Sequence, residues 1–447
     1  MLHANLVSDL AVDPGEREVL RAWAEQAPRE AWLLRPGDVL VSPVPVGEEF
    51  LRYVCGLTGV PRDSVAVVVP PGDGTADACR HVVGAVGGRP LRAVLPTALD
   101  GAAIGLARAL GVPVAPYPSV AAAEAALGVT GLLNTKAGFR SVAPALGMRL
   151  PDGLVRRRDG VPGAVRELLA SYGRVVVKPD RSAGGHGMLF LAEAEAEAEA
   201  EADDAADAPD PWTGGLAPVG GPEGLWVVER RIDVARSVSV QMETGPGGTR
   251  ALFSGEMRTA DGAFTGYLSP LPEPSAHVAA TLEAWGHALG GFLAARGYAG
   301  PFGLDAMVTP GGEVFAGESN VRRTATTTPQ AMVTRLVAGD VSGAGAGGGT
   351  GGGGPVWATG KVRAPVAYPF AAAVERLRRE RLAYDPARAE GIVLYAGPPP
   401  DGLTWRYAVI AGDHAGVARY EELLRASWAS APGGPTARSG PPGSRSG

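Results

Sequence analysis

The sequence predicts an α/β layer, followed by a larger α+β unit and a small α+β module toward the C-terminal end. Short apolar strands alternate with helical patterns over residues 1–130, whereas later strands are paired around glycine turns. The chain has 447 residues, 45% of them hydrophobic and 20% charged. It is therefore long enough for two or three domains with sizeable cores.

Charge and cysteine content exclude several classes of protein. The formal net charge is −6, but nine acids lie between Glu193 and Asp210 without a base, so the remainder is close to neutral and gives no sign of a nucleic-acid surface. Only Cys55 and Cys79 are present, too few for a disulfide framework. The first residues lack the pattern of a signal peptide and no apolar run reaches bilayer length, so we expect a soluble cytoplasmic protein with no membrane partner.

The first 130 residues predict a parallel sheet. Residues 38–43, 65–69, 93–96 and 112–114 are expected strands, and residues 48–56, 75–86 and 97–110 are expected helices between them. No G-x-G-x-x-G motif follows the first strand, so dinucleotide binding has no support there.

Composition divides the rest of the chain. We expect a domain over residues 131–340, containing an acidic mobile insertion at 191–222. A glycine-rich linker at 341–354 leads to a module at 355–428, and a Pro, Gly and Ser-rich tail at 429–447 is expected to be disordered.

A lysine-led glycine loop lies in the centre of the sequence. Three valines, Val175 to Val177, predict a buried strand that ends at Lys178, and the loop that follows contains Ser182, Gly184, Gly185, His186 and Gly187. Glycines let backbone N–H groups turn toward an oxyanion, and an ammonium beside them neutralises phosphate. A phosphate cradle and an ordinary turn are both open from this stretch alone.

A hairpin further along predicts a metal site. If Gly311-Gly312 forms a two-residue turn, Asp305 lies opposite Glu318, and Asn320 shares their face. Two carboxylates and an amide oxygen on one face fit Mg²⁺, which prefers hard oxygen ligands. The alternative is an exposed polar hairpin face.

Two arginines follow this hairpin. Arg322 lies two residues after Asn320 and is therefore expected on the same face, beside the metal. Its guanidinium there suits a carboxylate or phosphoryl group. Arg323 is expected to point away. A structural ion pair for Arg322 is the alternative.

The loop, a strand ending in Glu229 and the Asp305…Glu318-x-Asn320 hairpin, in this order, resemble the ATP-grasp superfamily over residues 38–335. The resemblance implies two α+β lobes that clamp ATP, with Mg²⁺ at Asp305, Glu318 and Asn320. Lys136 matches the family's earlier lysine, and Val227 to Ile232 match the hinge beside adenine. The implied ATP contacts are Lys136, Lys178, Ser182, Gly184, Gly185, His186, Gly187, Glu229, Arg230, Ile232, Asp233 and Met307.

A narrower resemblance extends to both ends of the chain. The leading layer is similar to a pre-ATP-grasp domain, and GESNVRRTATTTP and the trailing module resemble pheganomycin-type peptide ligases. Two positions depart from the family: Arg236 stands where a ribose-binding acid is common, with Asp233 as a substitute, and Thr328 stands where many relatives have His. The wall around adenine is expected from Val177, Val228 and Met307, for which a core role is equally open.

The resemblance implies an ATP-dependent carboxylate–amine ligase that acts through an acyl phosphate, with an unusual amino acid and a peptide or amine acceptor as substrates. Arg322 and Arg258 are the candidates for stabilising the oxyanion. Glu229 either accepts the adenine amino group or forms an ion pair in the lobe. An ATP-grasp kinase and a non-catalytic nucleotide-binding protein are the alternatives, and a homodimer is expected from similar ligases.

Overall fold

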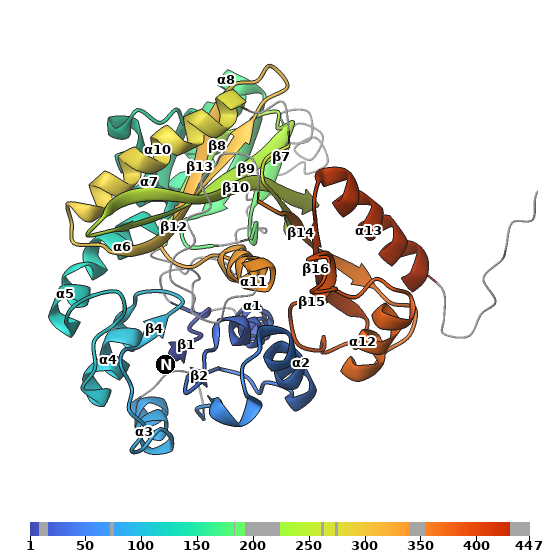
Figure 1. The fold of residues 1–447 in the computed structure, drawn as a ribbon. Coiled ribbons are helices and arrows are strands. Elements are labelled where there is room, and N and C mark those ends of the chain that lie inside the picture. Colours follow the sequence, from blue (N-terminus) through green and yellow to red (C-terminus); the bar gives the residue numbers. More distant parts are fainter. Residues whose placement is uncertain are drawn as a thin grey trace, which may run out of the picture.

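The fold is taken from a computed structural model that describes residues 1–8, 17–71, 76–182, 184–192, 224–260, 263–272, 276–338 and 354–429 (Figure 1). Three expectations fall almost wholly outside these ranges, namely the acidic insertion, the glycine-rich linker and the C-terminal tail. Within the described residues, no helix is both long and apolar enough to cross a membrane.

The N-terminal part is the expected parallel α/β layer. Its four strands pair in the order β3-β2-β1-β4, with β1 at Leu2–His3, β2 at Val39–Val41, β3 at Ala66–Val68 and β4 at Leu95–Pro96. The helices are α1 (Arg17–Ala24), α2 (Glu48–Thr58), α3 (Ala76–Ala85) and α4 (Gly101–Leu110). Sequence analysis missed the two-residue strand β1, although it lies in the middle of the sheet.

Three short helices connect this layer to the next lobe. They are α5 (Val120–Ala125), α6 (Leu127–Leu133) and α7 (Lys136–Val142). Thr135 begins α7 by accepting a hydrogen bond from the Gly138 backbone N–H. This cap fixes Lys136 as the first residue of the helix.

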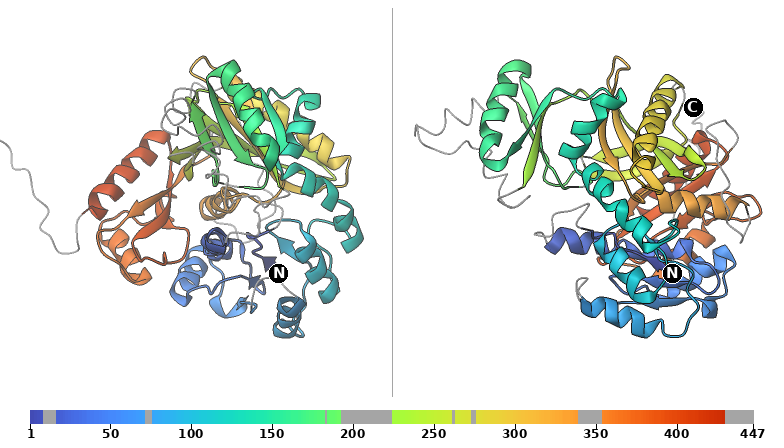
Figure 2. Two further views of the ribbon diagram at one scale, coloured as in Figure 1. Left: turned by 180° about the vertical axis from the view of Figure 1, so that it is seen from behind. Right: turned by 90° about the vertical axis from the view of Figure 1, so that its left-hand side faces the viewer.

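The small lobe is a four-stranded antiparallel sheet with one helix on one face. The order is β5 (Gly153–Arg157), β8 (Leu225–Arg230), β6 (Arg174–Pro179) and β7 (Leu189–Ala192), and α8 (Val161–Tyr172) covers the sheet. Figure 2 shows this lobe standing away from the N-terminal layer.

Side-chain alternation decides which valines of this lobe are core residues. Val177 and Val228 are fully buried in a cluster with residues of α8. Neighbouring strand residues point to opposite faces, so Lys178 and Val227 point to the other side. The expectation that Val177 and Val228 line the adenine site is therefore wrong, and the core alternative holds.

The large lobe is built on an eight-stranded sheet in which every described pairing is antiparallel. Its first five strands are β13 (Val314–Asn320), β12 (Gly300–Val308), β9 (Arg236–Gly245), β10 (Gly248–Ala260) and β11 (Ala263–Ser269). Helix α10 (Ala276–Ala294) packs on one face, where Leu282 and Leu289 share a core with Val240 and Leu304. The opposite face is left for the site.

The C-terminal module continues the same sheet. Strand β14 (Val356–Arg363) pairs with β11, and β16 (Thr404–Ala411) and β15 (Gly391–Leu394) follow. Helices α12 (Phe370–Arg379) and α13 (His414–Trp428) complete the module, and α11 (Thr327–Ala338) lies between it and the N-terminal layer (Figure 1). The module is thus joined to the large lobe by backbone hydrogen bonds.

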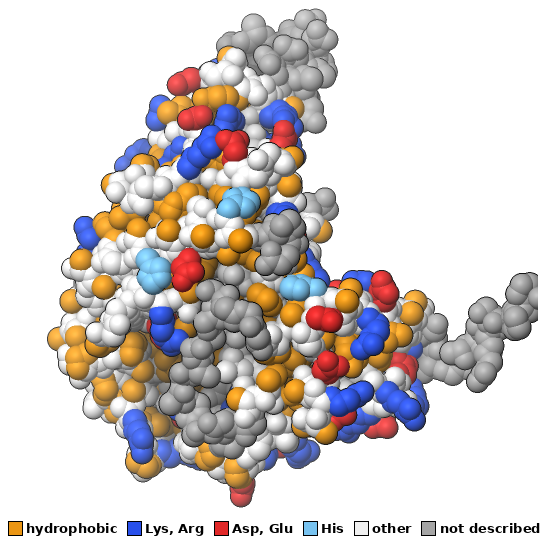
Figure 3. All heavy atoms as spheres, turned by 45° about the horizontal axis from the view of Figure 1, so that its top comes forward, with side chains coloured by type: hydrophobic (Ala, Val, Ile, Leu, Met, Phe, Trp, Pro, Cys, Tyr) orange, Lys and Arg blue, Asp and Glu red, His pale blue; other side chains and the backbone are white. Residues whose placement is uncertain are grey.

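On the face shown in Figure 3, Lys and Arg side chains are mixed with Asp and Glu side chains over the described surface. Neither sign of charge forms a continuous stripe on that part of the face.

Candidate active site

The hairpin β12–β13 brings the three predicted metal ligands together. Asp305 lies opposite Glu318, and Asn320 lies opposite Gly303 on the same face. The Asn320 side-chain amide donates a hydrogen bond to Asp305 Oδ2 at 3.0 Å. The predicted cluster is therefore present.

The turn that was used to predict this register is different from the expected one. Val308 pairs with Val314 and Thr309 N–H donates to Glu313 O, so the loop contains Pro310, Gly311 and Gly312 rather than two residues. Gly312 has φ +83°, as such a loop requires. A bulge after Asp305 then restores the predicted alignment with Glu318. The two-residue turn was wrong, and the bulge compensates for it.

The two carboxylates of the cluster have different electrostatic surroundings. Burial, and next the charge of Glu318, raise the pKa of Asp305 to about 8. Burial also acts to raise the pKa of Glu318, but the charge and hydrogen bond of Lys136 lower it overall. A cation would stabilise both carboxylates, and the donor set of two carboxylates and an amide fits Mg²⁺.

Lys136 connects this cluster to the glycine loop. Its ammonium lies 3.1 Å from Glu318 Oε2 and donates to Ser182 O at 2.7 Å and to Ser182 Oγ at 3.1 Å. Asp180 holds the start of α7, because its side chain accepts from the Ala137 backbone N–H at 2.7 Å. Residues from three elements thus meet at one ammonium group.

The loop has the backbone conformation that its glycines allow. Gly184, Gly185 and Gly187 have φ values of +65°, +85° and +70°. The Phe264 backbone N–H donates to Gly184 O at 3.4 Å, so the loop lies against β11 of the large lobe. His186 is half-buried between these glycines.

Lys178 and Glu229 form a buried ion pair on the small lobe. The Glu229 carboxylate accepts from Lys178 through Oε2 and from Arg140 through Oε1, the latter at 2.8 Å. The Glu229 side chain is 6% exposed. Glu229 therefore forms the ion pair within the lobe that was one of the two roles expected from the sequence.

Arg140 was not identified from the sequence. It lies one helical turn after Lys136 on α7, and this i, i+4 spacing could have indicated that both side chains reach the same region.

The residues expected to form the hinge, Val227 to Ile232, lie in the second part of β8 and just after it. The Arg230 guanidinium is 5.4 Å from the ring centre of Tyr172 and 5.8 Å from that of Phe315. Asp233 is exposed and lies 2.9 Å from Arg174, which lowers its pKa first by a hydrogen bond and then by its charge. Ile232 is half-buried between them in the chain. The carboxylate proposed as a ribose contact is therefore held by Arg174.

Met307 and Arg258 occupy different parts of the large sheet. Met307 is half-buried on the strand β12, two residues beyond Asp305 and thus on the same face. Arg258 on β10 binds Glu421 of α13, and Tyr407 donates to the same carboxylate at 3.0 Å. Arg258 is therefore tied to the C-terminal module.

Arg322 projects beside the cluster, as predicted from its position two residues after Asn320. Its guanidinium donates to Asn320 Oδ1 at 2.6 Å and to Asn134 Oδ1 at 3.0 Å. Burial lowers its pKa, while Glu318 and Asp305 raise it. Arg323 points elsewhere, with its guanidinium 3.8 Å from Glu30.

Thr328 is a core residue rather than a surface contact. It is fully buried and donates to Glu30 Oε1 at 2.7 Å. This hydrogen bond fixes α11 to the N-terminal layer, and the buried Thr328 side chain is not exposed to any substrate.

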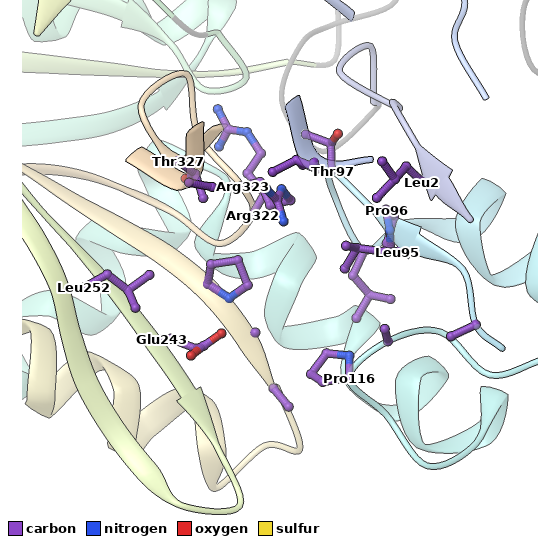
Figure 4. Close-up of a pocket in the computed structure, with 18 of the residues that line it drawn as sticks. Leu2, Leu95, Pro96, Thr97, Pro116, Glu243, Leu252, Arg322, Arg323 and Thr327 are labelled. Carbon is purple, nitrogen blue, oxygen red and sulfur yellow. The ribbon is translucent and has the colours of Figure 1, made fainter. Parts of the chain in front are cut away.

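A cavity of about 660 Å³ opens beside Arg322, between the N-terminal layer and the large sheet. In Figure 4, Arg322, Arg323 and Thr97 lie together, Glu243 and Leu252 come from the sheet, and Leu2, Leu95 and Pro116 come from the N-terminal layer. The cavity is large enough for a molecule bigger than a single amino acid.

Comparison with known proteins agrees with this architecture. A family model described as a pre-ATP-grasp domain matches residues 27–112, and one described as the PGM1 C-terminal domain matches residues 372–424. No curated protein sequence matches the chain.

Solved structures match nearly the whole chain at low identity. N5-carboxyaminoimidazole ribonucleotide synthetase from Thermus thermophilus is 17% identical with a TM-score of 0.55, covering 92% of this chain and 98% of its own. N5-carboxyaminoimidazole synthase from Aspergillus clavatus, in complex with ADP and 5-aminoimidazole ribonucleotide, is 12% identical with a TM-score of 0.55 and coverages of 89% and 99%. L-amino acid ligase from Bacillus licheniformis is 14% identical with a TM-score of 0.52 and coverages of 95% and 96%.

The chain therefore has the ATP-grasp fold, as the resemblance predicted. The region that matches the pre-ATP-grasp model precedes its two lobes.

Proposed function

We propose that the protein is an ATP-dependent carboxylate–amine ligase that forms an amide bond through an acyl phosphate. The observation that carries the proposal is the cluster of Asp305, Glu318 and Asn320, with Lys136 on one side and Arg322 on the other. Arg322 also lines the 660 Å³ cavity. This arrangement connects a site for nucleotide phosphates to a space for an organic substrate.

The chain's own residues would perform the positioning. Lys136, Lys178 and the backbone N–H groups of the glycine loop would hold the ATP phosphates. Asp305, Glu318 and Asn320 would hold Mg²⁺, which would neutralise charge on the phosphates. Arg322 would orient the substrate carboxylate toward the γ-phosphoryl group.

In the first step a carboxylate oxygen attacks the γ-phosphorus, and the bond to ADP breaks. In the second step the amine attacks the acyl carbon, phosphate leaves, and the amine loses a proton to solvent or phosphate. The Arg322 guanidinium would stabilise the oxyanion that forms on the acyl oxygen. No covalent bond to the protein is needed.

The finer assignment joins an unusual amino acid to the amino terminus of a peptide in secondary metabolism. The likeness to an L-amino acid ligase supports this choice through the fold, and the cavity volume supports it through size. A cytoplasmic location and a homodimer belong to the same proposal.

The test is product analysis with purified protein, Mg·ATP, a pooled panel of amino acids and short peptides. ADP together with a new amide mass is expected. AMP would refute the acyl-phosphate route, and ADP with only a phosphorylated product would establish the kinase instead. Nucleotide binding without turnover of any acid would favour a non-catalytic nucleotide-binding protein.

A further inference from the structure

The cavity beside Arg322 has an unbalanced set of charges. Its described lining includes two acids, Asp38 and Glu243, and six arginines, namely Arg35, Arg92, Arg250, Arg322, Arg323 and Arg335. A cleft lined mainly by one sign of charge concentrates ligands of the opposite sign. The excess of arginine therefore favours anionic ligands.

Both acids of the lining already have cationic or N–H partners. Glu243 accepts from Arg250 at 2.6 Å. Asp38 accepts from the Arg35 backbone N–H at 2.9 Å and lies 3.8 Å from the N-terminal ammonium. Neither acid is therefore positioned to neutralise the positive charge of the remaining arginines.

Two further arginines of the lining have partners within the protein. Arg323 faces Glu30. Arg335 donates to Leu34 O at 2.6 Å and to Trp32 O at 3.3 Å, and burial, followed by the charge of Arg35, lowers its pKa. These side chains hold α11 and the segment before it against the N-terminal layer.

Arg322 and Arg92 differ from these. Among the residues that the structure describes, Arg322 donates only to the neutral amide oxygens of Asn134 and Asn320. Arg92 has no hydrogen-bond or ion-pair partner among the described residues, and it lines the cavity. Both guanidinium groups can therefore bind an anion without breaking an existing ion pair.

The two groups reach the cavity from different parts of the fold, because Arg322 follows β13 of the large lobe and Arg92 comes shortly before β4 of the N-terminal layer. The Arg323 backbone N–H binds Thr97 O, which places this end of the hairpin at Thr97. Arg92 precedes Thr97 by five residues, and an extended chain of that length spans at most about 17 Å. The cavity lining also contains many apolar residues, among them Leu95 and Leu252 (Figure 4).

We propose that the carboxylate substrate carries a second anionic group, remote from the reacting carboxylate, and that Arg92 binds this group. The proposal rests on the proposed function, because Arg322 is assumed to hold the reacting end. A molecule with two anionic groups joined by an apolar segment matches a cavity whose lining offers these two arginines together with many apolar side chains. The second group is a carboxylate or a phosphate, since a guanidinium binds both in a bidentate manner.

The test is calorimetric titration of the full chain in the presence of Mg²⁺ and a non-hydrolysable ATP analogue. The probes are linear α,ω-dicarboxylates from glutarate to sebacate, their monomethyl esters, and ω-phosphonocarboxylates of the same lengths. We expect the dianions to bind about five- to tenfold more tightly than the monoesters at one preferred length. The carboxylate and phosphonate series distinguish the two kinds of anion.

Arg92→Gln should remove this preference and leave monoester binding unchanged. The matched control is Arg89→Gln, an exposed arginine three residues earlier that does not line the cavity. Nucleotide binding without a preference for dianions, or a preference that survives in Arg92→Gln, would overturn the inference. Absence of nucleotide binding would instead refute the proposed function.

Discussion

Replacing Glu229 with Gln tests the buried ion pair of the small lobe. In Gln the single carbonyl oxygen can accept from Lys178 or from Arg140, and the other cation then faces an NH₂ group. The Lys178 and Arg140 side chains are 12% and 15% exposed, so water replaces the lost contact poorly.

The expected loss of stability in Glu229→Gln follows from the burial of this ion pair. Removing one partner of a buried pair costs about 3–5 kcal/mol. Arg140 keeps its hydrogen bond to Pro151 O at 2.6 Å, which reduces the cost. We expect a loss of about 3 kcal/mol in the free energy of unfolding for Glu229→Gln.

The assay is urea denaturation of the ligand-free protein, followed by tryptophan fluorescence. The control is Asp233→Asn, which breaks the exposed pair with Arg174 and should leave stability unchanged. If the Glu229 variant lost less than about 1 kcal/mol, the ion pair would not be a main support of the lobe. Loss of adenine selectivity at unchanged stability would point to the base contact instead.

Three further changes test the site. Asp305→Asn should lower the rate of ADP formation at least about 100-fold without lowering the Tm, because it relieves repulsion from Glu318; a normal rate would exclude Asp305 as a metal ligand. Arg322→Lys keeps the charge but loses the planar fork, so KM for the acid should rise about tenfold or more, and an unchanged KM in steady-state kinetics would contradict the assignment. Thr328→Val should cost about 1–3 kcal/mol in thermal unfolding, since it leaves Glu30 with one acceptor unpaired, and no loss would show that the hydrogen bond is dispensable.

Local patterns predicted much of the fold and the cluster of Asp305, Glu318 and Asn320. Strand alternation placed Asp305, Glu318 and Asn320 on one face because the period of a strand is fixed. Strand alternation also places Val177 on the face opposite to Lys178. The expectation that Val177 lines the adenine site could therefore have been rejected from the sequence.

Other features depend on contacts between distant parts of the chain. The register of β12 and β13 shifts after Asp305, and β14 pairs with β11 across the glycine-rich segment. The Arg258–Glu421 contact follows from that pairing. Local sequence patterns do not reveal pairing between distant strands, which explains why the C-terminal module was expected to be separate and why Arg258 was expected to stabilise the oxyanion.

The pairing of β14 with β11 also determines how the large lobe would change if the C-terminal module were removed. Without the C-terminal module, β11 would become an outer strand whose unpaired N–H and C=O groups could recruit another molecule. Trp357, fully buried against Phe253 and Tyr267, would leave an aromatic surface in water. The module therefore covers a strand edge and an aromatic surface that the large lobe would otherwise expose to water.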